Sequence, residues 1–403
     1  MKSRIKKTVS SWLTRGPMNY NLLFAILFLN IYGLIMIYSS SYYSATSLNL
    51  PSSHFVTHQA EYLLIGLVAM YVVSKIDYHI WMKMGWIGYG VAIILVVLLK
   101  TKFGVGALGA IRWLEFGPIR FQAAEPIKLF MMVFYAMYMA EYGLTSPGKR
   151  LVAWVLAGVM GLLLGVVSDN MSTAIIIVGI CYIIFMVSQK RIGIYWKVIA
   201  AIVVLVAVVL LAIEFVLPIT PGENFRITRI RAFLHPEEYT ASTGLQAQQA
   251  LYAIGAGGFW GQGLGQSLVK FKLSEPYNDY ILAIICEEMG VFGACLLLFL
   301  YGYLFTQIVK VERIACDVEG KIFCTGVFAQ VAIQTILNVM VVVNWFPTTG
   351  VSLPFISYGG ASAIFLLIEF GVVFNIDKVA RNRKYHYEAV KQINKEEERR
   401  KHY

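Results

Sequence analysis

Ten long apolar runs are the feature that most restricts what this chain can fold into. A membrane-spanning helix needs about 20 consecutive apolar residues, and most of the runs approach or exceed that length. The composition agrees, because 58% of the 403 residues are hydrophobic and only 14% are charged, against about 25% charged in soluble domains. We therefore expect an all-α, polytopic integral membrane protein. Soluble enzymes, secreted disulfide scaffolds and disordered proteins are excluded.

The expected spans are about ten transmembrane helices, most of them joined by short loops. They lie at 22–42, 57–74, 82–99, 124–141, 151–167, 171–188, 194–216, 279–308, 322–345 and 361–376. One long outer loop, 217–278, separates the seventh span from the eighth. We expect a cytoplasmic basic N-terminal segment at 1–21, a transmembrane domain at 22–376 and a cytoplasmic basic tail at 377–403.

The distribution of Lys and Arg predicts that both termini are cytoplasmic. Of the 34 Lys and Arg residues only nine fall on the opposite side, all in the loops 100–123 and 217–278, and the positive-inside rule puts that side outside. These two basic loops are therefore candidates for binding an anionic ligand. Because long loops cross membranes regardless of charge, a solvated basic surface is the alternative. We expect no nucleic-acid partner.

Ionisable side chains at membrane depth are costly and are functional candidates for that reason. Glu125 and Lys128 are three residues apart on one helix face, where they either neutralise each other or present charge to a ligand. Glu287, Glu288 and Glu369 lie deeper. Adjacent carboxylates cannot share one helix face, so we expect one of Glu287 and Glu288 to pack inward.

Asp279 follows the long outer loop and stands at the mouth of an apolar helix. It is either the N-cap of that helix or, facing a basic loop, a general base. Within the loop, Arg226, Arg229 and Arg231 alternate with isoleucines, which indicates a short amphipathic element lying on the interface. Arginine guanidinium groups suit the oxygens of phosphate and pyrophosphate.

Two segments rich in glycine accompany the last spans. Six glycines fall within 255–265, which allows close approach of a ligand to the backbone. The segment 347–360 holds two prolines and three glycines, which is typical of a re-entrant, cavity-lining loop. The histidines show no metal-ligand spacing and no Cys lies in an outer loop, so we expect neither a metal site nor an external disulfide.

Several of these segments carry recognisable motifs. Residues 33–41 read GLIMIYSSS, residues 112–114 read RWL, residues 121–128 read FQAAEPIK, residues 257–266 read GGFWGQGLGQ, and residues 347–360 read PTTGVSLPFISYGG. In this order, on a ten-span chain, they resemble the SEDS family of bacterial cell-wall proteins, the FtsW, RodA and SpoVE group, and FtsW most. The resemblance covers roughly residues 17–378.

The resemblance implies a peptidoglycan glycosyltransferase that polymerises lipid II into β-1,4 glycan strands for cell division or cell shape. It would act at the outer face of the bacterial cytoplasmic membrane. The family's essential Asp falls on Asp279, which would serve as general base. Its other conserved positions fall on Trp113, Glu125 and Lys128 as substrate contacts. The leaving pyrophosphate would be neutralised by outer-loop arginines such as Arg229, or by a divalent cation, Mg²⁺ or Mn²⁺.

The implied partners are lipid II, undecaprenyl-pyrophosphate-linked glycan, a class B penicillin-binding protein that crosslinks the product, and other membrane proteins of the divisome or elongasome. Two alternatives stay open. One is a lipid II flippase, with the charged residues of the spans as its pathway. The other is a non-catalytic scaffold that activates the penicillin-binding protein. It is kept open by Tyr277-Asn278, where the family usually has His-Thr.

Overall fold

Helices dominate the structure, a computed structural model that describes most of residues 18–401. Outside the description within that range are residues 108–109, 118, 144–145, 169, 190–192, 194, 202–203, 205–207, 209–224, 236–237, 239–242 and 274. The described helices are α2 (Tyr20–Ser47), α3 (His54–Val73), α4 (Tyr78–Lys83), α5 (Gly85–Leu98), α6 (Ala124–Tyr142), α7 (Pro147–Leu162), the π-helical η1 (Leu163–Val167), α8 (Met171–Ser188), α10 (Phe225–Leu234), α11 (Thr243–Gly257), the 3-10 turn η2 (Val269–Phe271), α12 (Ile281–Ile314), α13 (Val318–Val342) and α14 (Gly360–Lys401).

Six described helices are long and apolar enough to cross a membrane: α2, α3, α7 with η1, α8, α12 and α13. The expected third span is divided between α4 and α5, which meet at Met84. The expected spans 124–141 and 361–376 form α6 and the first part of α14. Most of the expected span 194–216 lies outside the described residues.

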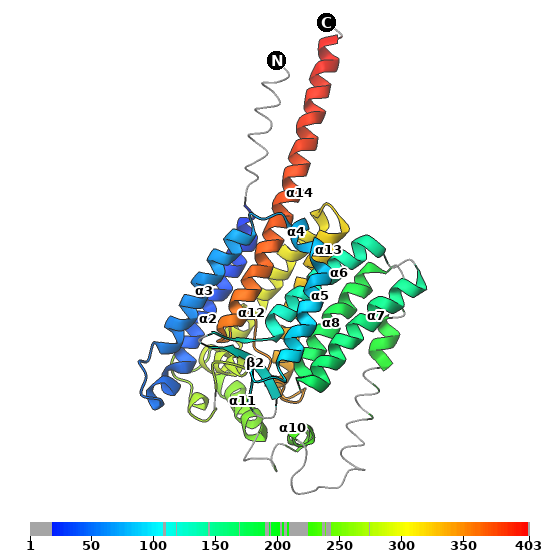
Figure 1. The fold of residues 1–403 in the computed structure, drawn as a ribbon. Coiled ribbons are helices and arrows are strands. Elements are labelled where there is room, and N and C mark those ends of the chain that lie inside the picture. The colour runs from blue at the N-terminus through cyan, green and yellow to red at the C-terminus, as the bar shows by residue number, and fades with distance from the viewer. Residues whose placement is uncertain are drawn as a thin grey trace.

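The helices form one bundle, and α2 begins at the same end of the bundle as α14 leaves it (Figure 1). α14 packs along α3 and then projects beyond the bundle, beside the start of α2. α13 packs against α6, α8 and α12. The opposite end carries α10, α11 and a small sheet. We call these the α14 end and the Asp279 end.

The basic loop at 100–123 contains a three-stranded antiparallel sheet, which the sequence did not predict. Its strands are β1 (Gly104–Ala107), β2 (Ala110–Phe116) and β3 (Ile119–Gln122), in the order β1-β2-β3. Trp113 pairs with Val105 and Gln122. Because successive side chains of a strand point to opposite faces, Arg112 and Trp113 are presented to different surroundings.

The glycine-rich segment packs directly on α12, which is kinked at Gly290 (φ 65°). The carbonyl oxygens of Glu287 and Glu288 accept hydrogen bonds from the backbone amides of Gln262 and Gly263 at 2.9 Å. In a regular helix these carbonyls would accept from amides four residues further along the same helix. At Gly261 an added Cβ would lie 2.2 Å from the Glu288 carbonyl oxygen. The sequence prediction that these glycines admit a ligand is therefore wrong at this position, because the space is taken by α12.

The side chains of Glu287 and Glu288 are both buried, so the expectation that only one packs inward is also wrong. Glu287 accepts from the Ser267 hydroxyl and from the Leu268 amide, the latter at 2.9 Å. Glu288 accepts from the Ser39 hydroxyl at 2.7 Å. The loop after the glycine-rich segment supplies the donors of Glu287, and α2 supplies Ser39 as the donor of Glu288, so each carboxylate has its own donors.

Between α13 and α14 the chain turns back into the bundle without helical structure, and Val351, Leu353 and Ile356 are buried there. The Asn338 amide of α13 donates to the Val351 carbonyl at 2.9 Å, and the Tyr301 hydroxyl of α12 donates to the Pro354 carbonyl. Buried carbonyl groups need such partners. The expected re-entrant, cavity-lining loop is confirmed.

Candidate functional site

Asp279 lies immediately before α12, yet it is not the cap of that helix. The N-cap is Tyr280, which makes no side-chain cap bond. The Asp279 backbone is fixed instead, because its carbonyl accepts from the Asn338 amide at 2.8 Å. Among the described residues, no hydrogen-bond donor contacts the Asp279 carboxylate. The side chain is partly exposed and held at the mouth of the bundle.

Two arginines from different segments face this carboxylate. Arg112 of β2 and the Asp279 carboxylate border Gly350: a Cβ added there would lie 2.8 Å from Arg112 Nη1 and 3.3 Å from Asp279 Oδ2. Arg229 of α10 donates to the Thr348 carbonyl at 3.2 Å. Burial lowers the pKa of Arg229, and the positive charge of Arg112 lowers it further. Two guanidinium groups and one carboxylate therefore share one small region.

The surroundings raise the pKa of Asp279 to about 6, and burial is the largest cause. Arg112 opposes this shift, Glu275 adds to it, and Arg229 opposes it. Burial disfavours the charged form of a carboxyl group, while nearby cations favour it. A carboxyl group balanced near this value is ionised at neutral pH and can still take up a proton, as a general base must.

Buried polar atoms without a hydrogen-bond partner gather around Asp279. They include Arg112 Nε, Asn278 Oδ1, Tyr280 Oη, Thr348 Oγ1 and Thr349 Oγ1. Buried polar groups are nearly always paired, and an unpaired one costs about 1–3 kcal/mol. A concentration of such atoms beside a carboxylate and two arginines is what a site for a polar ligand requires.

A narrow cavity joins this region to the predicted residues Glu125 and Lys128. Arg112, Gly350, Glu125 and Lys128 all line it, and it offers about 30 Å³, room for about one or two water molecules. Lys128 Nζ lies 2.9 Å from Glu125 Oε2, with only 2% and 5% of the two side chains exposed. The two residues thus neutralise each other and also line the cavity beside the site, while the presentation of charge to a ligand stays a prediction.

Trp113 is not part of this arrangement. It is half-buried in β2, and the guanidinium of Arg120 stacks over its ring at 5.2 Å. Its neighbour Arg112 points toward Asp279 instead. The sequence motif RWL was assigned to a substrate contact through its tryptophan, and the residue that the structure brings to the site is the arginine. Strand alternation would have indicated this, had the strand been predicted.

The sequence departures Tyr277 and Asn278 have structural roles beside the site. Tyr277 is buried between Phe55 and Tyr358, with ring centroids 4.5 and 5.6 Å away. Its carbonyl accepts from the Tyr358 amide at 3.0 Å, and the Asn278 carbonyl accepts from the Ser357 hydroxyl at 2.7 Å. The Tyr277 ring and two backbone carbonyls therefore attach the Asp279 segment to the re-entrant loop, and of the two departures only Tyr277 contributes its side chain to this attachment.

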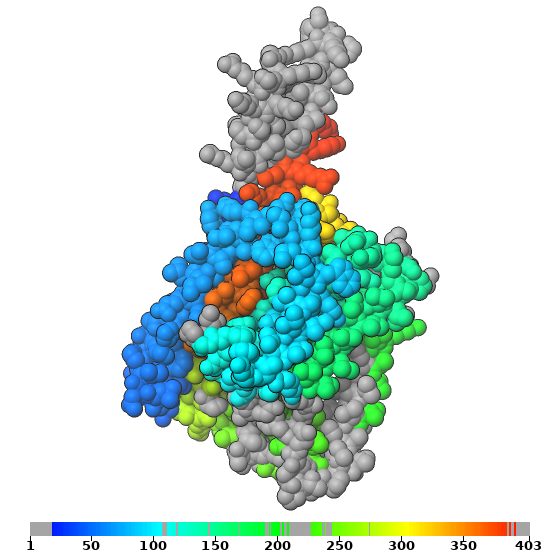
Figure 2. All heavy atoms as spheres, in the orientation of Figure 1, coloured from blue at the N-terminus to red at the C-terminus, as the bar shows by residue number. Residues whose placement is uncertain are grey.

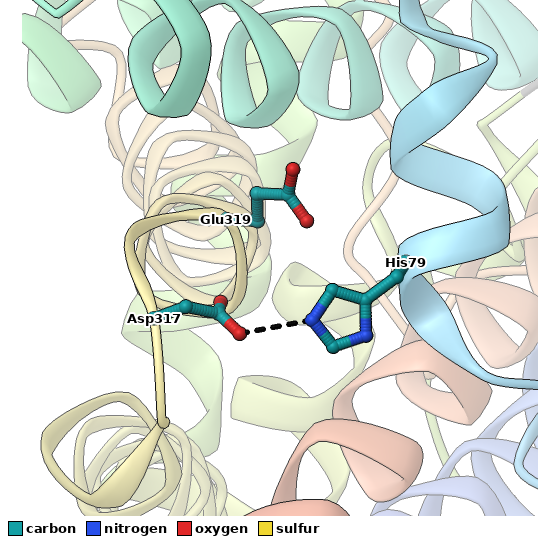
Figure 3. A group of neighbouring side chains, drawn as sticks. All are labelled: His79, Asp317 and Glu319. Carbon is teal, nitrogen blue, oxygen red and sulfur yellow. Dashed lines mark hydrogen bonds and ion pairs between the residues drawn. The ribbon is translucent and has the colours of Figure 1, made fainter.

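Within the part of the chain that the structure describes, one side-chain group has metal-ligand geometry, and it lies at the α14 end. The ligand atoms of His79, Asp317 and Glu319 are within 4.8 Å of one another (Figure 3). His79 Nε2 lies 3.0 Å from Asp317 Oδ2 and its Nδ1 lies 2.6 Å from Asp77 Oδ1. Both ring nitrogens are thus engaged by carboxylates, which tie α4 to the start of α13.

This cluster is remote from Asp279. Asn338, which holds the Asp279 carbonyl, lies in the same helix as Glu319 and near its other end. At 1.5 Å per residue the two ends are about 30 Å apart. The His79 group therefore takes no part in the candidate site.

Comparison with known proteins places these features in a family. A sequence profile of cell cycle proteins, the FtsW, RodA and SpoVE family, matches residues 20–382. Stage V sporulation protein E of Bacillus subtilis is 32% identical over 354 residues, which cover 87% of this chain and 94% of that protein. The probable peptidoglycan glycosyltransferase FtsW of Bacillus subtilis is 30% identical over 395 residues, which cover 94% of each.

Solved structures share the fold. A chain of a peptidoglycan synthase complex that coordinates polymerization and crosslinking matches with a TM-score of 0.71 at 21% identity, over 90% of this chain and 98% of that one. The rod shape determining protein RodA of Thermus thermophilus matches with a TM-score of 0.61 at 19% identity, over 89% and 96%. This chain therefore belongs to the FtsW, RodA and SpoVE family and is a multi-pass protein of the bacterial cytoplasmic membrane.

Proposed function

We propose that this protein is a peptidoglycan glycosyltransferase that polymerises lipid II into β-1,4 glycan strands at the outer face of the cytoplasmic membrane. Relatives about 30% identical over most of the chain are named probable peptidoglycan glycosyltransferases. The observation that carries the proposal is the Asp279 carboxylate. It has no hydrogen-bond donor among the described residues, its pKa is raised to about 6, and two arginines face it.

In this reaction Asp279 acts on the acceptor sugar. The carboxylate takes the proton of the N-acetylglucosamine 4-hydroxyl of an incoming lipid II while that oxygen attacks the anomeric carbon of the growing glycan. The bond from this carbon to the pyrophosphate oxygen breaks, and undecaprenyl pyrophosphate leaves with the bonding electron pair. A single displacement inverts the α-linked donor into a β-linked product. The proton on Asp279 then returns to solvent.

Arg112 and Arg229 stabilise the negative charge that develops on the leaving pyrophosphate. Preorganised cations in a region poor in water stabilise a departing pyrophosphate without having to reorient during the reaction. Arg229 was expected from the sequence in this role, and Arg112 joins it because β2 brings it beside Gly350. Lys128 forms an ion pair with Glu125, and its connection to the ligand site is the cavity that it lines together with Arg112.

A divalent cation, Mg²⁺ or Mn²⁺, stays a prediction. Mg²⁺ is commonly held by one or two carboxylates together with substrate phosphates. Among the described residues, Glu275 is the one further carboxylate whose charge affects the pKa of Asp279. Two carboxylates could hold such an ion only together with oxygens of the substrate. When bound, the ion would supply charge neutralisation to the pyrophosphate, which the two arginines already provide.

Both substrates carry long lipid tails, so the bundle must open sideways to the bilayer. Figure 2 shows part of α14 set back between α3 and α5, so that a single face of the bundle is furrowed. We infer that this furrow takes a polyprenyl tail while its head group lies at the Asp279 end. The implied partner is a class B penicillin-binding protein, in line with the complex of polymerization and crosslinking that shares this fold. Other divisome or elongasome proteins stay a prediction.

The flippase alternative depends on the deep carboxylates as a pathway. Two of them already accept hydrogen bonds from other parts of the fold. Glu287 accepts from Ser267 and Leu268, and Glu288 accepts from Ser39. Glu369 accepts from the Gln330 amide at 2.9 Å. These bonds fix segments of the fold, and this favours the enzyme over the flippase.

The test of the proposal is glycan formation by the purified protein supplied with lipid II. The reaction is run with and without a class B penicillin-binding protein whose crosslinking is blocked. We expect long uncrosslinked glycan strands from the wild-type protein. Lipid II translocation across vesicles without any polymer, with the partner present, would instead establish the flippase. Neither activity, together with a higher crosslinking rate of the partner, would establish the scaffold.

A further inference from the structure

We propose that a cavity at the α14 end binds the phosphate head group of an anionic phospholipid. The cavity measures about 650 Å³ and lies where the start of α2, the end of α12 and the middle of α14 meet. Its walls include Asn21, Gln307, Lys310, Arg381 and Lys384. The site is distinct from the Asp279 region and goes beyond the proposed function.

The cations reach the cavity by helical spacing. Gln307 and Lys310 are three residues apart on α12, and Arg381 and Lys384 are three residues apart on α14, so each pair shares one helix face. The face of α12 and the face of α14 meet across the cavity. Amide and ammonium donors are thereby directed at one space from two sides.

The charge in this cavity is not balanced by protein carboxylates. Asp377 is its single described acidic residue, and it is already satisfied: Arg381 Nε lies 2.8 Å from Asp377 Oδ2, and the Asn19 amide donates to Oδ1 at 3.2 Å. Lys310 and Lys384 are exposed and make no ion pair with any described residue. Two positive charges therefore remain for an anion.

A second cavity at the same end has the opposite balance of charge. It is lined by Lys83 together with Glu141 and Glu319, so its single lysine faces two carboxylates. The first cavity also includes Asn19 and Asn21 at the start of α2. The positive end of a helix dipole lies there and favours an anion within the first turn.

Aromatic side chains on the bilayer side of the cations favour a lipid over free phosphate as the anion. Phe24, one turn beyond Asn21 in α2, is 54% exposed, and its ring packs edge-on against Tyr303 at 6.5 Å. Tyr303 lies two turns before Lys310, about 10 Å away along α12. A head group at the lysines would thus have its acyl chains against these rings.

By the positive-inside rule the α14 end is cytoplasmic, so the bound lipid belongs to the inner leaflet. Basic pockets between transmembrane helices on this side are known to hold anionic head groups. The cavity joins α2, α12 and α14, and an occupied site would therefore connect three helices that are far apart in the sequence.

The experiment measures binding of phosphatidylglycerol to the purified full-length protein by native mass spectrometry in detergent. Phosphatidylcholine and inorganic phosphate are the comparison ligands. The test variant is Lys310→Gln with Lys384→Gln, and the matched control is Lys83→Gln, a lysine at the same end of the bundle. We expect phosphatidylglycerol to bind the double variant about ten- to thirtyfold more weakly than wild type, and Lys83→Gln to bind as wild type.

Three outcomes would overturn the site. One is equal binding of phosphatidylcholine and phosphatidylglycerol by the wild-type protein. Another is phosphatidylglycerol binding that is the same in the double variant and in wild type. The third is inorganic phosphate displacing the lipid at equal molar concentration, since that would make the ligand a soluble phosphate. A thermal unfolding scan of each variant checks that it is folded, and the single variants Lys310→Gln and Lys384→Gln replace the double one if it is not.

Discussion

At the scale of single residues, the charge of Asp279 sets the conditions under which the protein can work. A general base acts only while it is ionised, and the pKa of Asp279 is raised to about 6, chiefly by burial. We therefore expect kcat/KM for lipid II polymerisation to rise with pH through about 6 and then to level off. Initial rates measured between about pH 5 and pH 8 check this. A rate that falls across that rise would contradict the assignment.

The positive charge of Arg112 should shift the pH dependence of kcat/KM. Arg112 lowers the pKa of Asp279, so its removal in Arg112→Gln should move the midpoint of the rise to higher pH, in addition to slowing the reaction. Arg120→Gln is the matched control, because Arg120 lies over Trp113 and not beside Asp279. If both variants keep the wild-type midpoint, Arg112 does not act on the base.

At this scale the sequence selected Asp279 as the candidate base but did not predict its surroundings. Asp279 could be chosen because a carboxylate at the mouth of a helix, after a basic loop, is unusual, and the motif resemblance agreed. Arg112 was passed over because the loop that contains it was not recognised as a sheet. The surroundings of the Asp279 carboxylate come from segments that are far apart in sequence, such as β2, α10 and the re-entrant loop.

At the scale of elements, the kink of α12 depends on one glycine. An added Cβ at Gly290 would lie 2.4 Å from Gly261 N and Phe259 O, and its φ of 65° is unfavourable for other residues. We expect Gly290→Ala to reduce stability by about 1–3 kcal/mol or more and to reduce polymerisation. Gly302→Ala in the same helix is the control, because nothing lies within 4 Å of its added Cβ.

Thermal unfolding in detergent measures this comparison. Gly302→Ala should leave stability unchanged or raise it by up to about 1 kcal/mol, since alanine is the better helix former. Equal stability of the two variants would show that the contact between the glycine-rich segment and α12 is not needed.

In the buried ion pair of α6, the effects on stability of substituting Glu125 and Lys128 should depend strongly on each other. Glu125→Leu leaves Lys128 charged and buried, which we expect to cost about 3–5 kcal/mol of unfolding free energy. Adding Lys128→Met replaces the pair with apolar side chains of similar volume and should recover most of that loss. Unfolding in detergent of the single and double variants checks this. A double variant less stable than Glu125→Leu would contradict it.

The sequence predicted most helices because long apolar runs are a strong local signal. It missed β1, β2 and β3 because strands of four to seven residues carry too little alternation to stand out. The glycines at 255–265 were predicted to admit a ligand, whereas Gly257 and Gly261 lie directly against the backbone of α12. That α12 is the partner of these glycines could not be predicted from the sequence. The kink in α12 that frees the carbonyls of Glu287 and Glu288 exists only in the folded bundle.

At the scale of the whole molecule, polymerisation of lipid II outside the membrane requires the Asp279 end to face outward. In Glu275→Cys, a membrane-impermeant maleimide added to intact cells should label the new thiol. The native Cys316, between α12 and α13, should be labelled only after the cells are permeabilised. Labelling of Cys316 in intact cells would reverse the orientation and with it the proposed access to lipid II.

The cavity at the α14 end and the His79 cluster could not be predicted for a related reason. Each joins residues that are more than two hundred positions apart, such as Asn21 with Lys384 and His79 with Asp317. Charge counts along the chain show that this end is basic. They do not show which lysines lack a carboxylate partner, because that depends on how α2, α12 and α14 meet.

The assignment of Asp279 as the base is tested by the amount of glycan polymer that Asp279→Asn forms from lipid II, compared with wild type and with Glu115→Gln. Glu115 is an exposed carboxylate of β2 and serves as the matched control. We predict a loss of about 10²–10⁴-fold for Asp279→Asn, with equal amounts of folded protein, and no loss for Glu115→Gln. Wild-type polymer yield from Asp279→Asn would contradict the account.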